Sequence, residues 1–167
     1  MGYRISTLKN LPPELGCYYF LIGDYRNRST INDLFREDFN VIADNLGESG
    51  AIVEKTYDRN MEYELIKALC HHPVLVENID IYQIRMPGLL IMRKHPLELT
   101  KNDCVIYIPF QILESTYSNA SELLWDLIAF AREENKNLIE KTKKKFPVIK
   151  GLSISVNMGI FALNIDL

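Results

Sequence analysis

The sequence predicts an α/β fold: a single domain with a mixed β-sheet and helices in a three-layer-like arrangement. Residues 17–22 form a continuous apolar run, a helical pattern follows, and a second apolar run occupies residues 51–53. Helix follows strand twice in this half, which predicts an N-terminal parallel β-α-β-α unit. Near the other end, alternating apolar residues predict a β-hairpin after a long helix. The 167 residues, 47% hydrophobic and 25% charged, are typical of one globular domain covering residues 1–167.

Residues 1–15 are expected to form an N-terminal arm or an edge strand. The run 17–22 is uninterrupted and ends at Gly23, which predicts a strand covered on both faces. After it, apolar residues recur at steps of three and four, and they are Ile31, Leu34, Phe35, Phe39, Ile42 and Leu46. This spacing predicts one amphipathic helix that ends at Gly47. With residues 51–53 it forms a right-handed crossover between two parallel strands.

Residues 60–71 are predicted to form a second helix, which Pro73 stops. Its apolar stripe consists of Met61, Leu65, Ile66 and Leu69. Strands are expected at residues 89–92 and 104–108, whereas residues 74–87 have no decisive pattern. One long helix is expected from residue 118 or 119 to about residue 144, with its charged later half along solvent. Its buried stripe would be Leu124, Leu127, Ile128, Ala131 and Leu138.

The cysteines and the charge indicate where the protein works. Cys17, Cys70 and Cys104 are odd in number and widely spaced, so we expect free thiols in a reducing compartment. The N-terminus has no secretory pattern and no apolar run approaches 18 residues, so we expect a cytoplasmic protein that does not enter membranes. The net charge of −3 provides no general attraction to nucleic acid. The lysine-rich residues 141–145 leave nucleic-acid binding as an alternative.

The sequence contains none of the common spacings for metal ligands, phosphate loops or nucleophilic triads. We therefore expect no metal and no cofactor, and favour a non-catalytic role.

The candidate ligand- or partner-binding site consists of charged loops after three strands. If those strands are parallel, their carboxyl ends meet at one edge of the sheet, where α/β proteins bind ligands. The residues are Asp24, Arg26, Arg28, Thr56, Asp58, Arg59, Arg93, Lys94 and His95. They form a cationic rim suited to a nucleotide phosphate or an acidic partner. The alternative is that these charges only solvate the edge.

The function that the sequence favours is protein interaction: a non-catalytic accessory subunit of a larger cytosolic assembly, such as a bacterial multi-protein or defence system. The expected partner is another protein or a second copy of the chain. One alternative is an α/β domain that senses or hydrolyses a nucleotide or another anionic ligand through the cationic rim. A second alternative is nucleic-acid binding.

Overall fold

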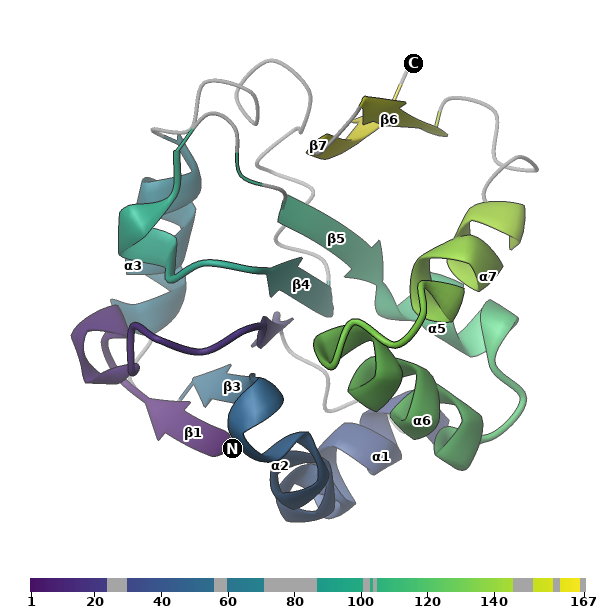
Figure 1. Cartoon of the computed structure of the whole chain (residues 1–167), viewed down its shortest axis with the longest axis horizontal. Coiled ribbons are helices and arrows are strands. Elements are labelled where there is room, and N and C mark those ends of the chain that lie inside the picture. Colours follow the sequence, from purple (N-terminus) through teal and green to yellow (C-terminus); the bar gives the residue numbers. More distant parts are fainter. Residues whose placement is uncertain are drawn as a thin grey trace.

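The computed structural model of this chain describes residues 1–23, 30–55, 60–70, 87–100, 103, 105–145, 152–157 and 160–165. At its centre is a five-stranded sheet with the strand order β1-β3-β2-β4-β5 (Figure 1). The strands are β1 (Gly2–Ile5), β2 (Tyr18–Ile22), β3 (Ala51–Lys55), β4 (Gly88–Met92) and β5 (Val105–Pro109). Neighbours β1, β3 and β2 are parallel, whereas β4 is antiparallel to both β2 and β5. The predicted α/β fold with a mixed sheet and a parallel N-terminal part is confirmed.

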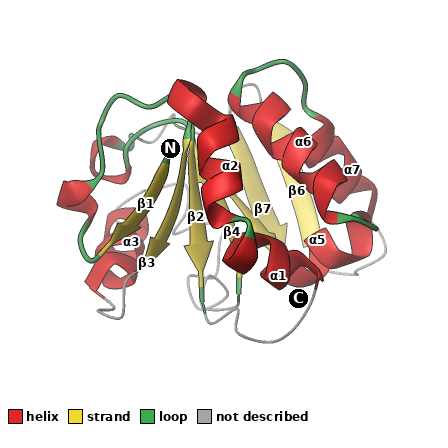
Figure 2. Ribbon diagram, turned by 90° about the horizontal axis from the view of Figure 1, so that it is seen from below, coloured by secondary structure: helices red, strands yellow, loops and turns green. Residues whose placement is uncertain are grey.

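Helices cover both faces of the sheet (Figure 2). The five-helix face carries α1 (Thr30–Glu37), α2 (Phe39–Leu46), α5 (Phe110–Thr116), α6 (Ala120–Ala131) and α7 (Asn137–Lys145), and the α3 face carries α3 (Asn60–Cys70). Side chains of β2 alternate between the two cores: Tyr19 and Leu21 join the five-helix face, while Tyr18 and Phe20 join the α3 face. All five residues of β2 are buried, because this central strand is covered on both sides.

The helix predicted between β2 and β3 is divided into α1 and α2. All six residues of its predicted stripe are buried. At Asp38, with φ −101° and ψ 15°, the chain turns while hydrogen bonds continue from Asp38 N–H to Leu34 O and from Ile42 N–H to Asp38 O. The prediction of one helix was wrong because this turn preserves the apolar spacing. It allows Phe35 to stack on Phe110 of α5, with 5.4 Å between ring centroids.

Irregular chain covers much of the α3 face. Because β1 and β2 both pair with β3, the connection between them crosses β3, and it does so without an α-helix. Leu8, in the short 3₁₀ helix η1 (Leu8–Asn10), and Leu11 are buried in the core of this face. The first strand is an edge strand, one of the two forms predicted for residues 1–15. On α3, Met61, Leu65 and Leu69 are buried as predicted, and Ile66 is half-buried.

The predicted long helix is also two helices. After Ala131 the chain reverses at Glu133, which has φ +62°. The N–H groups of Glu133 and Glu134 bond to Phe130 O and Ala129 O, which is a Schellman ending. Glycine normally occupies that left-handed position, so a glutamate there gives no sequence signal.

The charged later half of that helix does not project along solvent. As α7 it packs against α5 and α6, and Leu138 and Ile139 are buried. Helix α5 was not predicted, although Phe110, Leu113 and Tyr117 are spaced by three and four residues and are buried.

The C-terminal hairpin is present, with β6 (Leu152–Asn157) antiparallel to β7 (Ile160–Ile165). Two further 3₁₀ turns are η2 (Gly47–Ser49) and η4 (Pro96–Glu98). Cys17 is a buried free thiol, and burial raises its pKa to about 11. The side chains of Cys70 and Cys104 and the segment 74–86 lie outside the described residues. Among the helices that are described, none combines the length and apolar character needed to cross a membrane.

Candidate functional site

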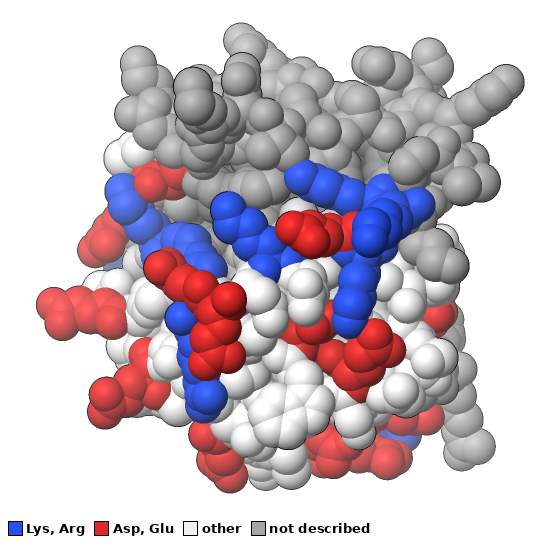
Figure 3. Space-filling model, turned by 45° about the vertical axis from the view of Figure 1, so that its right-hand side comes forward, with Lys and Arg blue, Asp and Glu red and all other residues white. Residues whose placement is uncertain are grey.

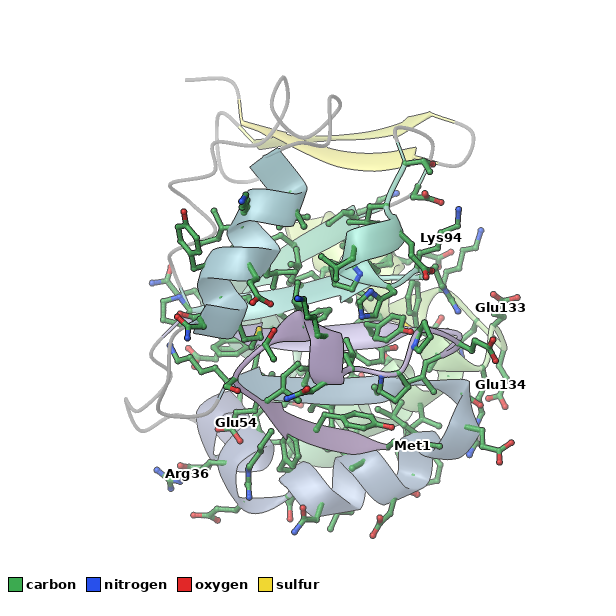
Figure 4. The ribbon with its side chains drawn as sticks, turned by 90° about the vertical axis from the view of Figure 1, so that its left-hand side faces the viewer. Met1, Arg36, Glu54, Lys94, Glu133 and Glu134 are labelled. Atoms are coloured by element: carbon green, nitrogen blue, oxygen red, sulfur yellow. The ribbon has the colours of Figure 1, made fainter. Side chains whose placement is uncertain are left out.

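The three strands that precede the loops of the predicted cationic rim, β2, β3 and β4, do not all end at the same edge of the sheet. Because β4 is antiparallel to β2, its carboxyl end lies at Tyr18, the amino end of β2. Figure 4 shows Lys94 on the same side as Met1, and Glu54, near the end of β3, on the other side. The expectation that all three loops meet at one edge was therefore wrong, since it assumed that all three strands are parallel. The other six predicted residues, Asp24, Arg26, Arg28, Thr56, Asp58 and Arg59, lie outside the described residues.

Arg93 caps the end of α6. Its guanidinium donates to Phe130 O at 2.7 Å and to Ala131 O at 3.2 Å, and it lies over the Phe130 ring. It also forms an ion pair with Glu133 at 3.2 Å. A cation at the carboxyl end of a helix interacts favourably with the helix dipole and stabilises the helix. The structure thus gives Arg93 a structural role, in joining β4 to α6.

Lys94 and His95 also have partners within the chain. Lys94 Nζ is 2.8 Å from Asp103 Oδ1. His95 is buried, accepts from the N–H of Leu97 through Nδ1, and places Nε2 3.2 Å from Leu8 O. A carbonyl can only accept, and Nδ1 already accepts from Leu97, so these contacts assign the ring proton to Nε2. The imidazole therefore anchors η1 to the loop after β4.

At the other edge, carboxylates of α3 accept hydrogen bonds from backbone N–H groups that follow the parallel strands β1 and β2. Glu62 Oε1 accepts from Gly23 N–H at 3.0 Å and from Lys55 Nζ at 2.8 Å. Glu64 accepts from Leu8 N–H at 2.7 Å and from the Thr7 hydroxyl. The Gly23 and Leu8 N–H groups, the Thr7 hydroxyl and the Lys55 ammonium are thus already paired with internal carboxylates.

A buried polar network joins α5, α6 and α7. Asp126, only 6% exposed, accepts from Lys141 Nζ at 2.7 Å and from the Tyr117 hydroxyl at 2.9 Å. Lys141 also donates to Glu122 at 2.8 Å. Hydrogen bonds to Asp126 and Glu122 raise the pKa of Lys141, and burial followed by the Asp126 hydrogen bond raises that of Tyr117. A protonated lysine and a neutral phenol suit an internal clamp that holds α7 in place.

Among the described residues, Trp125 of α6 is the most exposed large hydrophobic side chain on the five-helix face, at 66%. Helices α2 and α6 are in contact and end at the same edge of the sheet: α2 leads into β3, and Arg93 caps α6. Arg132 donates to Asn45 O at 3.1 Å, and Trp125 lies seven residues before Arg132, on the same side of its helix. Trp125 therefore flanks the contact between α2 and α6.

The α2–α6 surface is defined by the exposed residues beside that contact. They are Val41, Asp44, Asn45, Glu48, Trp125 and Arg132. Val41, Asp44 and Asn45 have the i, i+3 and i+4 spacing of one face of α2, and Glu48 follows in η2. Val41 is 47% exposed, so α2 adds an apolar side chain to that of Trp125.

The charges around the α2–α6 surface are predominantly acidic. Residues 37–54 contain five acidic residues and no lysine or arginine, and residues 104–131 also contain no lysine or arginine. In the lower half of Figure 3, acidic side chains lie around an uncharged area, whereas most Lys and Arg side chains lie higher. This part of the molecule is therefore suited to cationic rather than anionic partners.

Most of the predicted buried stripe is confirmed, because Leu127, Ile128, Ala131 and Leu138 are buried, but the prediction did not single out Trp125. Leu123, Leu127 and Phe130 are buried, and Leu124 is only half-buried. Trp125 lies two residues from both Leu123 and Leu127, which places it away from that stripe. The spacing of Trp125 to Leu127 was therefore a signal, available in the sequence, that Trp125 is exposed.

Among the described residues, no group of three or more His, Cys, Asp or Glu side chains is placed to hold a metal ion. No protein-family model, curated protein or solved structure matches the chain.

Proposed function

We propose that this protein is a non-catalytic interaction or accessory subunit of a larger cytosolic assembly, and that it binds another protein. A bacterial multi-protein or defence system is one setting in which such a subunit would act. The fold supplies a rigid sheet with helices on both faces, and such a scaffold presents its outer helix faces in a fixed geometry.

The observation that supports this proposal is the exposure of Trp125. Tryptophan is enriched at protein interfaces and carries much of their binding energy. Trp125 lies on a helix whose other aromatic residue, Phe130, is buried. A large exposed apolar side chain on the same surface as the exposed Val41 is best explained as a contact that a partner covers.

The anion-binding alternative requires free cations. In the described part of the chain, Arg93 and Lys94 pair with Glu133 and Asp103, and Lys55 pairs with Glu62. The nucleic-acid alternative rests on residues 141–145, where Lys141 pairs with Glu122 and Asp126. These internal pairs favour the protein-interaction proposal over both alternatives.

The test is purification of the tagged full-length chain from its own cells at native expression level, followed by mass measurement of the intact particle. We expect a complex with a protein partner in fixed stoichiometry. A particle of monomer mass that carries a bound nucleotide would support the anion-binding alternative, and one that carries nuclease-sensitive material would support the nucleic-acid alternative. Either result would refute the proposed function.

A further inference from the structure

The α2–α6 surface combines an exposed indole with an acidic surround. Trp125 is 66% exposed, although the apolar side chains of Leu123, Leu127, Ile128 and Phe130 on the same helix are buried. The chain has one tryptophan, so the single largest side chain of the protein is displayed on this surface.

The few cations near this surface are engaged by other groups. Arg132 bonds to Asn45 O and lies 4.0 Å from Glu134. Lys141 is held by Glu122 and Asp126. The amino group of Met1 bonds to the carbonyls of Gly47 and Gly50. A positively charged partner would therefore meet an acidic environment that these cations only partly offset.

This charge distribution selects between possible occupants. Two copies of the α2–α6 surface would bring acidic groups together, and nucleic acid or an anionic membrane would be repelled in the same way. A cationic segment is attracted, and a guanidinium finds its strongest aromatic partner in tryptophan.

We propose that the α2–α6 surface binds an arginine-rich amphipathic segment of a partner protein, with an arginine or apolar side chain against Trp125. This proposal rests on the proposed function and specifies the chemistry of the partner. Asp44 and Glu48 attract the cations of that segment, and Val41 extends the apolar contact.

The test uses three labelled helical peptides of about four turns that share one leucine face and carry Arg, Gln or Glu on the other face. Binding to the purified full-length chain is measured by anisotropy of the label. We expect the Arg peptide to bind at least about tenfold more tightly than the Gln and Glu peptides, and its affinity to fall as salt rises from about 0.05 to about 0.3 M.

Two variants locate the contact. Trp125→Ala should lower the affinity for the Arg peptide about tenfold, and Asp44→Asn/Glu48→Gln should lower it about threefold. Tyr63→Ala is the matched control, because Tyr63 is 70% exposed on α3, on the opposite face of the sheet. It should leave binding unchanged, and thermal melting should show that all three variants are folded.

Equal binding of the Arg and Glu peptides, or equal losses in Trp125→Ala and Tyr63→Ala, would overturn the proposal. The same variants should be assayed in the native complex. A partner that is retained by Trp125→Ala leaves the proposed function standing and refutes only the α2–α6 surface, whereas a chain without any protein partner refutes the proposed function itself.

Discussion

The two faces of the sheet are covered in different ways. On the five-helix face, amphipathic helices supply continuous apolar stripes, and the main buried polar group is Asp126 with its partners. On the α3 face, irregular chain lies over β3, and side chains bond its backbone: Glu64 accepts from Leu8 N–H, and the Tyr18 hydroxyl accepts from Leu15 N–H and donates to Pro12 O.

The difference follows from where backbone hydrogen bonds are made. A helix satisfies its own N–H and C=O groups, so it needs only an apolar face to pack. A crossing segment without a helix leaves these groups unpaired, and burying them without partners costs about 1–3 kcal/mol each. Side-chain acceptors such as Glu64 take the place of the missing helix. The two faces should therefore respond differently to substitution.

The largest effect is expected on the five-helix face. Phe39→Ala should reduce the free energy of unfolding by about 3–5 kcal/mol, because it leaves a cavity where α2 packs on the sheet. Phe39 is 4% exposed and lies against Gly2 of β1 and under the Arg4 guanidinium. Chemical denaturation measures the loss, with the exposed Asn40→Ala as control. A loss below about 1 kcal/mol would show that apolar packing does not dominate this face.

Asp126→Ala should be the next most damaging substitution, at about 1–3 kcal/mol, because it leaves the buried Tyr117 hydroxyl without its acceptor. Lys141 is about one-third exposed and can recover hydration, which limits the cost. Glu122→Ala, which removes the more exposed partner of Lys141, should cost less than about 1 kcal/mol. Hydrogen exchange should show α7 loosened in the first variant only. Equal losses for both variants would contradict a buried clamp.

On the α3 face, Glu64→Ala should cost about 1–2 kcal/mol and should act locally. The carboxylate accepts from Leu8 N–H and the Thr7 hydroxyl, so faster amide exchange is expected at residue 8 with little change in α6 or α7. Glu114→Ala, an exposed glutamate of α5, is the matched control. Unchanged exchange at residue 8 would mean that the crossing segment does not depend on this acceptor.

The smallest expected effect concerns pH. Desolvation raises the pKa of Asp103, but hydrogen bonds from Lys94 and Thr100 outweigh it and lower the pKa to about 2. Since the unfolded value is about 3.9, the stabilisation is complete above that pH and is lost as pH falls towards 2. The contribution should be under about 1 kcal/mol, because Lys94 is half exposed.

Asp103→Asn tests this contribution. The difference in unfolding free energy between wild type and variant should be constant near neutral pH and shrink between about pH 4 and pH 2. If the difference in unfolding free energy stayed constant between about pH 4 and pH 2, the cost of Asp103→Asn would come from altered packing or hydrogen bonding and not from the lost charge.

The sequence by itself determined the helices and strands whose apolar residues recur at a regular spacing. The apolar run of β2, the stripe shared by α1 and α2, the helix α3 and the alternation in the C-terminal hairpin all follow from local spacing. These patterns predicted the α/β class and the parallel pairing of β2 with β3, because burial of one face is encoded every two or every three to four residues.

The tertiary structure alone decided the direction of β4, the reversal at Glu133 and the contact between α2 and α6. Strand direction depends on the path of the preceding chain, and the left-handed conformation of Glu133 forms the reversal after which α7 packs on α5 and α6. The direction of β4 explains why the predicted rim is not a single site. Because β4 is antiparallel to β2, it carries Arg93, Lys94 and His95 to the edge opposite the carboxyl end of β2. The α2–α6 surface arises because two helices distant in sequence end at the same edge, a relation that no local pattern specifies.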